Sequence, residues 1–273
     1  MNQTDLATPV RKKRVRKGPP DAPRLRFWFI LAKETLTTCS IVALSLEMAE
    51  PFHCIGLENI PEQGSFVLAI NHTNVRWTPR MLASIHLATI QRRPELAEEW
   101  LVIVGHREPR LERLQPWQRW FALKIRRFYD QIYHRWKYNS LRLPMDNDGA
   151  SLKALREWRI RSKTQPSLVF PEGRAATTFR EVRLGSGRWL AALGVPVLPV
   201  AGWWDETRKG WVLDFGLPIE WSAQTNLQDL QLGLAIAEAL PPEEAPDWQA
   251  ALTRWRTVHS PEITTQDRHE EPS

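Results

Sequence analysis

Three short apolar segments, each ended abruptly by polar or turn-forming residues, constrain the fold of this 273-residue chain more than any other feature. They span residues 66–70, 167–170 and 194–200. Runs of this length that are rich in strand-forming residues and bounded by Gly or Pro are typical of buried β-strands. Helical patterns of apolar residues lie between them. The alternation predicts an α/β fold with a single mixed, mostly parallel sheet flanked by helices.

The first segment ends in Asn71 and His72, and a helical pattern begins after Thr78-Pro79. Open α/β sheets form their active sites at the carboxyl ends of strands. Imidazole is the side chain that titrates nearest neutral pH, so His72 is a candidate general base. The alternative is that His72 caps the following helix or binds a loop carbonyl.

The second and third segments carry their own turn signals. Residues 171–174 read Pro-Glu-Gly-Arg, and because Pro and Gly interrupt a central strand, Glu172 and Arg174 are expected where this strand ends. The alternative for these two residues is a surface ion pair at a turn. In the third segment, Pro196 and Pro199 favour a strand at an edge or a bulge of the sheet.

Taken together, Asn71-His72, the Phe-Pro-Glu-Gly of residues 170–173 and the Gly-Val-Pro-Val-Leu-Pro-Val of residues 194–200 resemble the motifs of a known family. This family is the glycerolipid acyltransferases, typified by 1-acylglycerol-3-phosphate acyltransferase. The resemblance covers residues 54–202. It implies transfer of a fatty acyl group from acyl-CoA or acyl carrier protein to the hydroxyl of a lysophospholipid or glycerol-phosphate acceptor. Neither a bound cofactor nor a metal ion is expected.

The resemblance also assigns roles to single residues. His72 corresponds to the catalytic general base, and the backbone amides around Gly173 could bind the developing oxyanion. Arg174 supplies the positive charge for the phosphate of the acceptor. The residues implied to bind substrate are Asn71, Glu172, Gly173, Arg174 and, as the nearest candidate on another strand, Arg142.

Two departures from the family pattern bear on the chemistry. The aspartate that the family carries five residues after the histidine is Trp77 here, and the arginine after Phe-Pro-Glu-Gly comes one position early, at Arg174. An indole cannot accept a hydrogen bond from the imidazole, so a backbone carbonyl or another carboxylate would have to orient His72. The alternative to an active acyltransferase is a catalytically impaired, lipid-binding homologue.

The charge distribution predicts the partners. Residues 1–26 carry eight basic and two acidic residues, which accounts for the whole net charge of +6. Such an arm is attracted to an anionic lipid surface, and no nucleic-acid-binding motif accompanies it, so no nucleic-acid partner is expected. The expected organisation is a disordered arm (1–24), an amphipathic, membrane-associating helical segment (25–50), an acyltransferase-like domain (51–258) and a disordered tail (259–273).

Two segments indicate peripheral or monotopic attachment to the cytoplasmic face of a phospholipid membrane. Charged residues interrupt the apolar pattern of residues 25–48, so this segment is expected to lie on the membrane instead of crossing it, or else to pack on the domain. Residues 111–138 interleave aromatic and basic side chains at helical spacing, and several of the chain's 14 tryptophans lie here. This pattern is typical of a helix at a membrane surface, or of one buried along a single face.

Overall fold

The structure is a computed structural model that describes residues 41–73, 77–106, 115–120, 123–124, 139–144 and 149–259. The predictions for the basic arm, for residues 25–40 and for the tail after residue 259 lie outside these ranges. So does most of the aromatic and basic segment 111–138.

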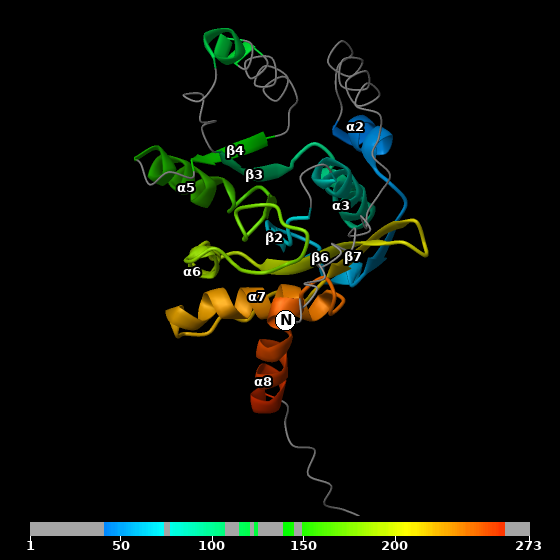
Figure 1. Ribbon diagram of the computed structural model, residues 1–273, viewed down its shortest axis with the longest axis vertical. Coiled ribbons are helices and arrows are strands. Elements are labelled where there is room, and N and C mark those ends of the chain that lie inside the picture. The colour runs from blue at the N-terminus through cyan, green and yellow to red at the C-terminus, as the bar shows by residue number, and fades with distance from the viewer. Residues whose placement is uncertain are drawn as a thin grey trace, which may run out of the picture.

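A single sheet forms the centre of the described chain, with strand order β1-β7-β6-β2-β5-β3-β4 (Figure 1). Neighbouring strands pair in parallel, except that β6 and β7 are antiparallel. The predicted class, a single mixed and mostly parallel sheet, is therefore confirmed. The strands are β1 (Phe52–Ile55), β2 (Val67–Ile70), β3 (Leu101–His106), β4 (Asn139–Pro144), β5 (Ser167–Val169), β6 (Val197–Asp205) and β7 (Gly210–Phe215).

Helices cover both faces of the sheet (Figure 1). Val67 and Ala69 of β2 pack in a core shared with α5, α6, α7 and α8, whereas Leu68 and Ile70 pack in a second core shared with α3. Successive strand residues point to opposite faces, so a strand covered on both sides must be apolar throughout, as β2 is. The helices are α2 (Ile41–Met48), α3 (Thr78–Arg92), α5 (Gly149–Arg161), α6 (Ser186–Ala191), α7 (Gln228–Ala239) and α8 (Gln249–His259).

The prediction that Pro196 and Pro199 place their strand at an edge or a bulge is wrong, because β6 lies inside the sheet between β7 and β2. Both prolines still contribute their carbonyl oxygens to hydrogen bonds with neighbouring segments. Pro196 O accepts a hydrogen bond from Val67 N at 2.9 Å, and Pro199 O accepts one from Gly216 N at 2.9 Å. The missing N–H groups thus leave these contacts intact.

The edge strand β1 was not predicted from the sequence. Its four residues alternate between half-buried (Phe52, Cys54) and exposed (His53, Ile55), and a run this short carries too little periodicity to identify.

Helix α2, the described end of the segment predicted to lie on a membrane, packs on α3. The contact includes a buried polar pair, in which the Ser45 hydroxyl lies 2.8 Å from His86 Nδ1. His86 Nε2 lies 3.0 Å from the Ala97 carbonyl. Because a carbonyl only accepts, Nε2 carries the hydrogen of the neutral ring and Ser45 donates to Nδ1. For residues 41–48, packing on the domain is what the structure shows.

None of the helices in the described ranges combines the length and the apolar character needed to cross a bilayer.

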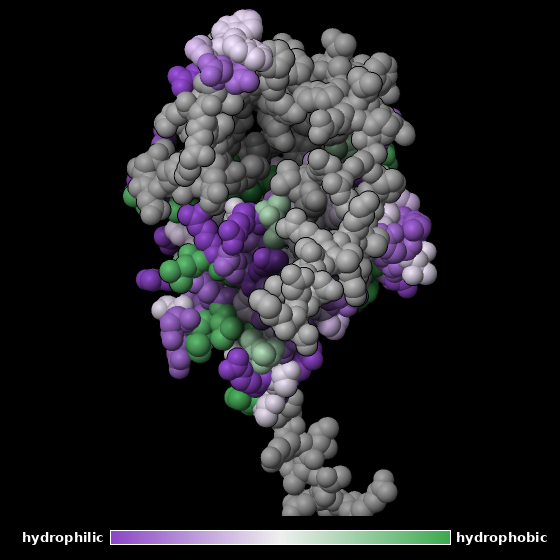
Figure 2. Space-filling view, in the orientation of Figure 1, coloured by the Kyte–Doolittle hydropathy of each residue, from purple (hydrophilic) through white to green (hydrophobic). Residues whose placement is uncertain are grey.

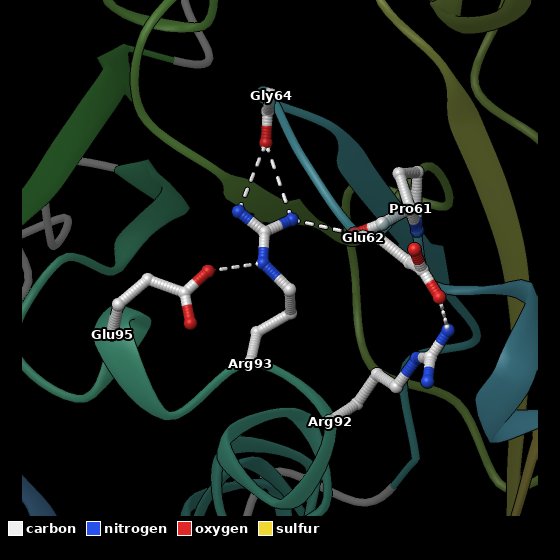
Figure 3. A network of polar contacts seen from close by, with 6 residues as sticks. All are labelled: Pro61, Glu62, Gly64, Arg92, Arg93 and Glu95. Atoms are coloured by element: carbon white, nitrogen blue, oxygen red, sulfur yellow. Dashed lines mark hydrogen bonds and ion pairs between the residues drawn. The ribbon is translucent and has the colours of Figure 1, made fainter.

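The approach to β2 is fixed by the buried guanidinium of Arg93, which follows α3 (Figure 3). Its Nη1 donates to Pro61 O at 2.5 Å, and both Nη atoms donate to Gly64 O at 3.4 Å. Nε donates to Glu95, and the guanidinium lies 5.9 Å from the Phe66 ring centroid. One planar group thereby binds two backbone carbonyls and a carboxylate at once.

Substitution of Arg93 is expected to destabilise the protein far more than substitution of its neighbour. Arg93→Lys keeps the charge, but one ammonium cannot span both carbonyls, so we expect the free energy of unfolding to fall by about 2 to 4 kcal/mol in urea denaturation. Arg92, which pairs with exposed Glu62, is the matched control, and Arg92→Lys should cost no more than about 0.5 kcal/mol. Equal losses in the two variants would contradict this account.

Candidate active site

Two of the predicted motifs meet at the carboxyl edge of the sheet. Asn71 and His72 follow β2 directly, and Phe170 to Glu172 follow β5. β2 and β5 are adjacent and parallel, with Ala69 level with Val169, so the chain leaves both strands at the same height. Residues about 100 positions apart in sequence are thereby neighbours, as the strand-end argument predicts.

The side chain of Glu172 binds the main chain of His72. Glu172 is 6% exposed, and its Oε1 accepts a hydrogen bond from His72 N at 2.7 Å. The His72 carbonyl accepts a second bond from Ala176 N at 3.1 Å. The loop after β5 therefore satisfies both backbone groups of residue 72 as it leaves the sheet.

Asn71 fixes the same strand end on its other side, against β6. Its amide Nδ2 donates to Gly202 O at 2.9 Å, and its Oδ1 accepts from Gly202 N at 2.7 Å. Gly202 has no room for a side chain, because a Cβ there would lie 2.9 Å from Met81 Sδ. In the structure Asn71 thus contacts backbone, and its predicted part in substrate binding stays a prediction.

The His72 ring is oriented by a backbone carbonyl. Nδ1 lies 2.9 Å from the carbonyl oxygen of Thr73. A carbonyl accepts hydrogen bonds and cannot donate them, so the neutral ring carries its hydrogen on Nδ1 and keeps a lone pair on Nε2. The ring packs on Phe170 at a centroid distance of 4.2 Å, and burial lowers its pKa from the usual 6.5. At neutral pH the ring is therefore an uncharged base.

Trp77, at the position of the family's aspartate, has an apolar role. It precedes α3, and its half-buried indole packs against the apolar core on the α3 side of the sheet. Thr73 O accepts the hydrogen bond from His72 Nδ1 that a carboxylate would otherwise accept. A carbonyl carries no net charge, so it orients the imidazole but stabilises the imidazolium less than a carboxylate does.

Burial raises the pKa of Glu172 from 4.5 to about 8. The nearby Glu181 raises the pKa further, whereas the hydrogen bond from His72 N and the charge of Arg174 lower it. Glu172 is consequently protonated over much of the neutral range. It serves as a hydrogen-bonding group for the backbone and not as a fixed negative charge beside His72.

The structure separates Arg174 from Glu172. The Arg174 side chain is 66% exposed and forms an ion pair with Glu181, at the surface of the same loop. The sequence left open whether Glu172 would bind substrate or form a surface ion pair with Arg174. The hydrogen bonds show a third arrangement, in which Glu172 holds the His72 main chain and Glu181 holds Arg174. The interpretation of residues 172 and 174 as an ion pair with each other is therefore wrong.

The amide of Gly173 is already used. Gly173 has a φ of 69°, in the left-handed region that favours glycine, and its N–H donates to Phe170 O at 3.1 Å. This bond closes the turn after β5, so Gly173 N cannot serve as an oxyanion donor without breaking it. The role expected of this one amide is corrected accordingly, and the turn it closes explains why glycine is needed here.

Arg142 lies on β4, level with Val104 of β3. Since β3 pairs with β5 and β5 with β2, Arg142 is three strands away from β2 in the sheet. At a spacing of about 4.8 Å per strand, its backbone is about 14 Å from β2. Its side chain is outside the described part of the chain, so its predicted role remains a prediction.

Sequence reasoning allowed for a backbone carbonyl behind His72 but did not identify Thr73 O, and it missed Ala176 N and both backbone groups of Gly202. Main-chain groups leave no trace in a motif, so nothing pointed to Thr73 O or Ala176 N in particular. Gly202 does carry a signal, because a glycine inside a strand marks close approach of another group. Within the described residues, no group of three or more His, Cys, Asp or Glu side chains could hold a metal ion.

Comparison with known proteins places these residues in a family. The sequence model of the family described as Acyltransferase matches residues 51–203, more than half of the chain, so this chain belongs to the acyltransferase family. The match contains His72, Glu172 and the third motif, and it confirms the predicted enzyme class.

Among solved structures, the chain is similar to the crystal structure of the 1-acyl-sn-glycerophosphate acyltransferase PlsC from Thermotoga maritima. The identity is 18%, the TM-score is 0.43, and the alignment covers 79% of this chain and 80% of that chain. No curated protein matches the sequence.

The raised pKa of Glu172 predicts a pH-dependent stability. The unfolded chain releases this proton near pH 4.5 and the folded protein near pH 8, so the stabilising contribution is complete below pH 4.5 and is lost as the pH rises to 8. Glu172→Gln keeps an oxygen for His72 N and cannot ionise. Over this window the stability of wild type relative to the variant should fall by on the order of 4 kcal/mol, measured by urea denaturation at several pH values. The exposed Glu99, replaced by Gln, is the matched control; a wild-type curve parallel to that of Glu172→Gln would refute the assignment.

Proposed function

We propose that this acyltransferase moves a fatty acyl group from an acyl thioester, acyl-CoA or acyl carrier protein, to the hydroxyl of a lysophospholipid or glycerol-phosphate acceptor. The observation that carries the proposal is the state of His72. It is neutral, oriented through Nδ1 by Thr73 O, and located at the carboxyl edge of the central strand. Such a ring offers Nε2 to a hydroxyl proton at neutral pH.

The reaction uses one proton transfer in each direction. Nε2 of His72 accepts the hydroxyl proton as the acceptor oxygen attacks the thioester carbonyl carbon. The tetrahedral intermediate then expels the thiolate, which takes the proton back from the imidazolium. An ester forms, a thioester breaks, and the enzyme returns to its starting state.

Arg174 is the proposed binding group for the acceptor phosphate. Its exposed guanidinium lies in the loop that begins at Glu172 and contacts the His72 main chain through Ala176 N. A phosphate would replace the Glu181 carboxylate and bind the guanidinium through two of its oxygens. The rest of this loop adds Arg180 and Arg183, and α6 adds Arg188; all three are exposed and favour an anionic substrate.

The lipid character of the acceptor makes peripheral attachment to the cytoplasmic face of a membrane part of the proposal. The sequence supports it through the basic arm of residues 1–26, which adds Coulombic attraction to an anionic leaflet.

The proposed role of His72 is tested by acyl-transfer assays with 1-acylglycerol-3-phosphate and either thioester donor. Because general-base catalysis contributes about 10²- to 10⁴-fold, we expect His72→Ala to lower kcat by that factor. Since the pKa of His72 is lowered, kcat/KM should rise with pH through an apparent pKa below 6.5 and then stay level through neutrality. His53, an exposed histidine on β1, is the matched control, and His53→Ala should be indistinguishable from wild type.

The outcomes of this assay also address the alternative of an impaired lipid-binding homologue. Equal background rates in wild type, His72→Ala and Trp77→Asp would end the enzymatic proposal. Activity gained only in Trp77→Asp would show that Thr73 O does not replace the missing carboxylate and would favour the impaired homologue.

The role of Arg174 is tested by changing the charge of the acceptor. A hydrogen-bonded charge pair contributes about 1.5 to 3 kcal/mol, so Arg174→Ala should raise KM for a phosphate-bearing acceptor by about 10- to 100-fold with little change in kcat. KM for an uncharged monoacylglycerol should not change. Arg208→Ala, which removes an exposed, ion-paired arginine from the β6–β7 turn, is the control. Equal increases of KM for both acceptors would show that Arg174 does not bind the phosphate.

A further inference from the structure

A short helical segment between β3 and β4 exposes its apolar side to solvent. Residues 116–120 and 123–124 are helical, and Trp117, Trp120 and Leu123 are 69%, 60% and 40% exposed. At 100° per residue these side chains fall within an arc of about 120°, so they share one face. Gln118, on the opposite side, is less exposed than its neighbours. We refer to Trp117, Trp120 and Leu123 as the tryptophan face.

This orientation is the reverse of that of an ordinary surface helix, which buries its apolar residues and exposes its polar ones. Other large exposed apolar residues, such as Leu184, Leu217 and Val258, belong to different segments of the chain, and single exposed apolar residues need no partner. Two indoles and a leucine on one face, by contrast, form a contiguous apolar surface of the kind that marks an interaction site.

The charge around the tryptophan face selects the kind of partner. Lys124 Nζ lies 4.8 Å from the centroid of the Trp120 ring, and Arg119 is exposed on the same segment. The described residues of the segment, 115–120 and 123–124, include no acidic side chain. An apolar surface whose described charged neighbours are cations fits a partner that is apolar and anionic at once.

The segment lies at an extremity of the molecule. It is the short green coil at the upper end of Figure 1, beyond β4, and in Figure 2 it forms the coloured group that projects at the upper left. In Figure 1, α7 and α8 lie away from this segment, on the other side of the sheet.

We propose that the tryptophan face inserts into the interfacial layer of an anionic phospholipid membrane. Tryptophan is the side chain enriched at that depth, where an apolar ring meets polar headgroups, and Lys124 beside it pairs with lipid phosphates. A second copy of the chain is a poorer occupant, because a two-fold interface would set Lys124 and Arg119 against their own copies. The inference deepens the proposed function, since it names the surface that brings the enzyme to a lipid acceptor.

The test is sedimentation of the full chain with vesicles of phosphatidylcholine, with and without 30 mol% phosphatidylglycerol. At 0.5 M salt the attraction of the basic arm is screened, so partitioning reports mainly insertion. We expect Trp117→Ala/Trp120→Ala to lower the partition coefficient at least tenfold, and Trp117→Phe/Trp120→Phe to retain most of it. Leu217→Ala/Val258→Ala, which removes exposed apolar side chains elsewhere, is the matched control. Lys124→Glu, at low salt, should lose binding mainly to the phosphatidylglycerol vesicles.

Partitioning of the double alanine variant equal to wild type would overturn the inference. So would a wild-type dimer that the double alanine variant dissociates without a change in vesicle binding, because the face would then bind a second copy. Activity on a short-chain, water-soluble acceptor separates this result from the proposed function. The double alanine variant should keep the wild-type rate on that acceptor. An inactive wild type that still binds vesicles through the tryptophan face would remove the proposed function and leave this inference standing.

Discussion

Satisfying the main chain where β2 leaves the sheet is the constraint on which the site depends. Beyond Ile70 the backbone has left its ladder, yet it is still enclosed, and an enclosed N–H or C=O without a partner is costly. Asn71 pairs with both backbone groups of Gly202, and Glu172 receives the His72 N–H. The polar residues of the motifs therefore first hold the chain in place. The imidazole of His72, held in position by these contacts, is the group proposed to carry out the chemistry.

Some motif residues hold the backbone and others face the substrate, which explains why neighbouring motif residues occupy such different environments. Glu172 is buried and largely protonated at neutral pH, whereas Arg174, two residues later, is exposed and paired with Glu181. Glu172 is a rigid interior group that fixes the base in position. Arg174 is a surface group that can exchange Glu181 for a charged substrate. Between them, Gly173 adopts a positive φ, and the turn it forms directs Glu172 to the interior and Arg174 to the surface.

The sequence was sufficient for the fold class and for the meeting of His72 with Glu172. Both follow from local rules: apolar runs mark strands, and parallel strands end on one edge. It was insufficient where the outcome depends on which strands are neighbours. Pro196 and Pro199 belong to an interior strand segment whose neighbours donate to their carbonyls, and Glu172 binds a backbone N–H instead of Arg174. The four residues of β1 escaped detection because a short edge strand has almost no periodic signal. A side-chain motif also gives no information about main-chain acceptors such as Thr73 O.

Because a backbone carbonyl orients His72, a side-chain substitution cannot remove the group that orients the ring. When an acidic side chain orients a catalytic imidazole, a single codon change deletes the support. Here the support belongs to the peptide unit of Thr73, which every amino acid possesses, and the Thr73 hydroxyl ties that residue to Met81 Sδ at 3.8 Å. The orientation of the ring is thus insensitive to the identity of the residue at 73 but sensitive to the path of the backbone through it. Because residue 77 does not have to orient His72, it can be an apolar residue that packs against the core on the α3 side of the sheet.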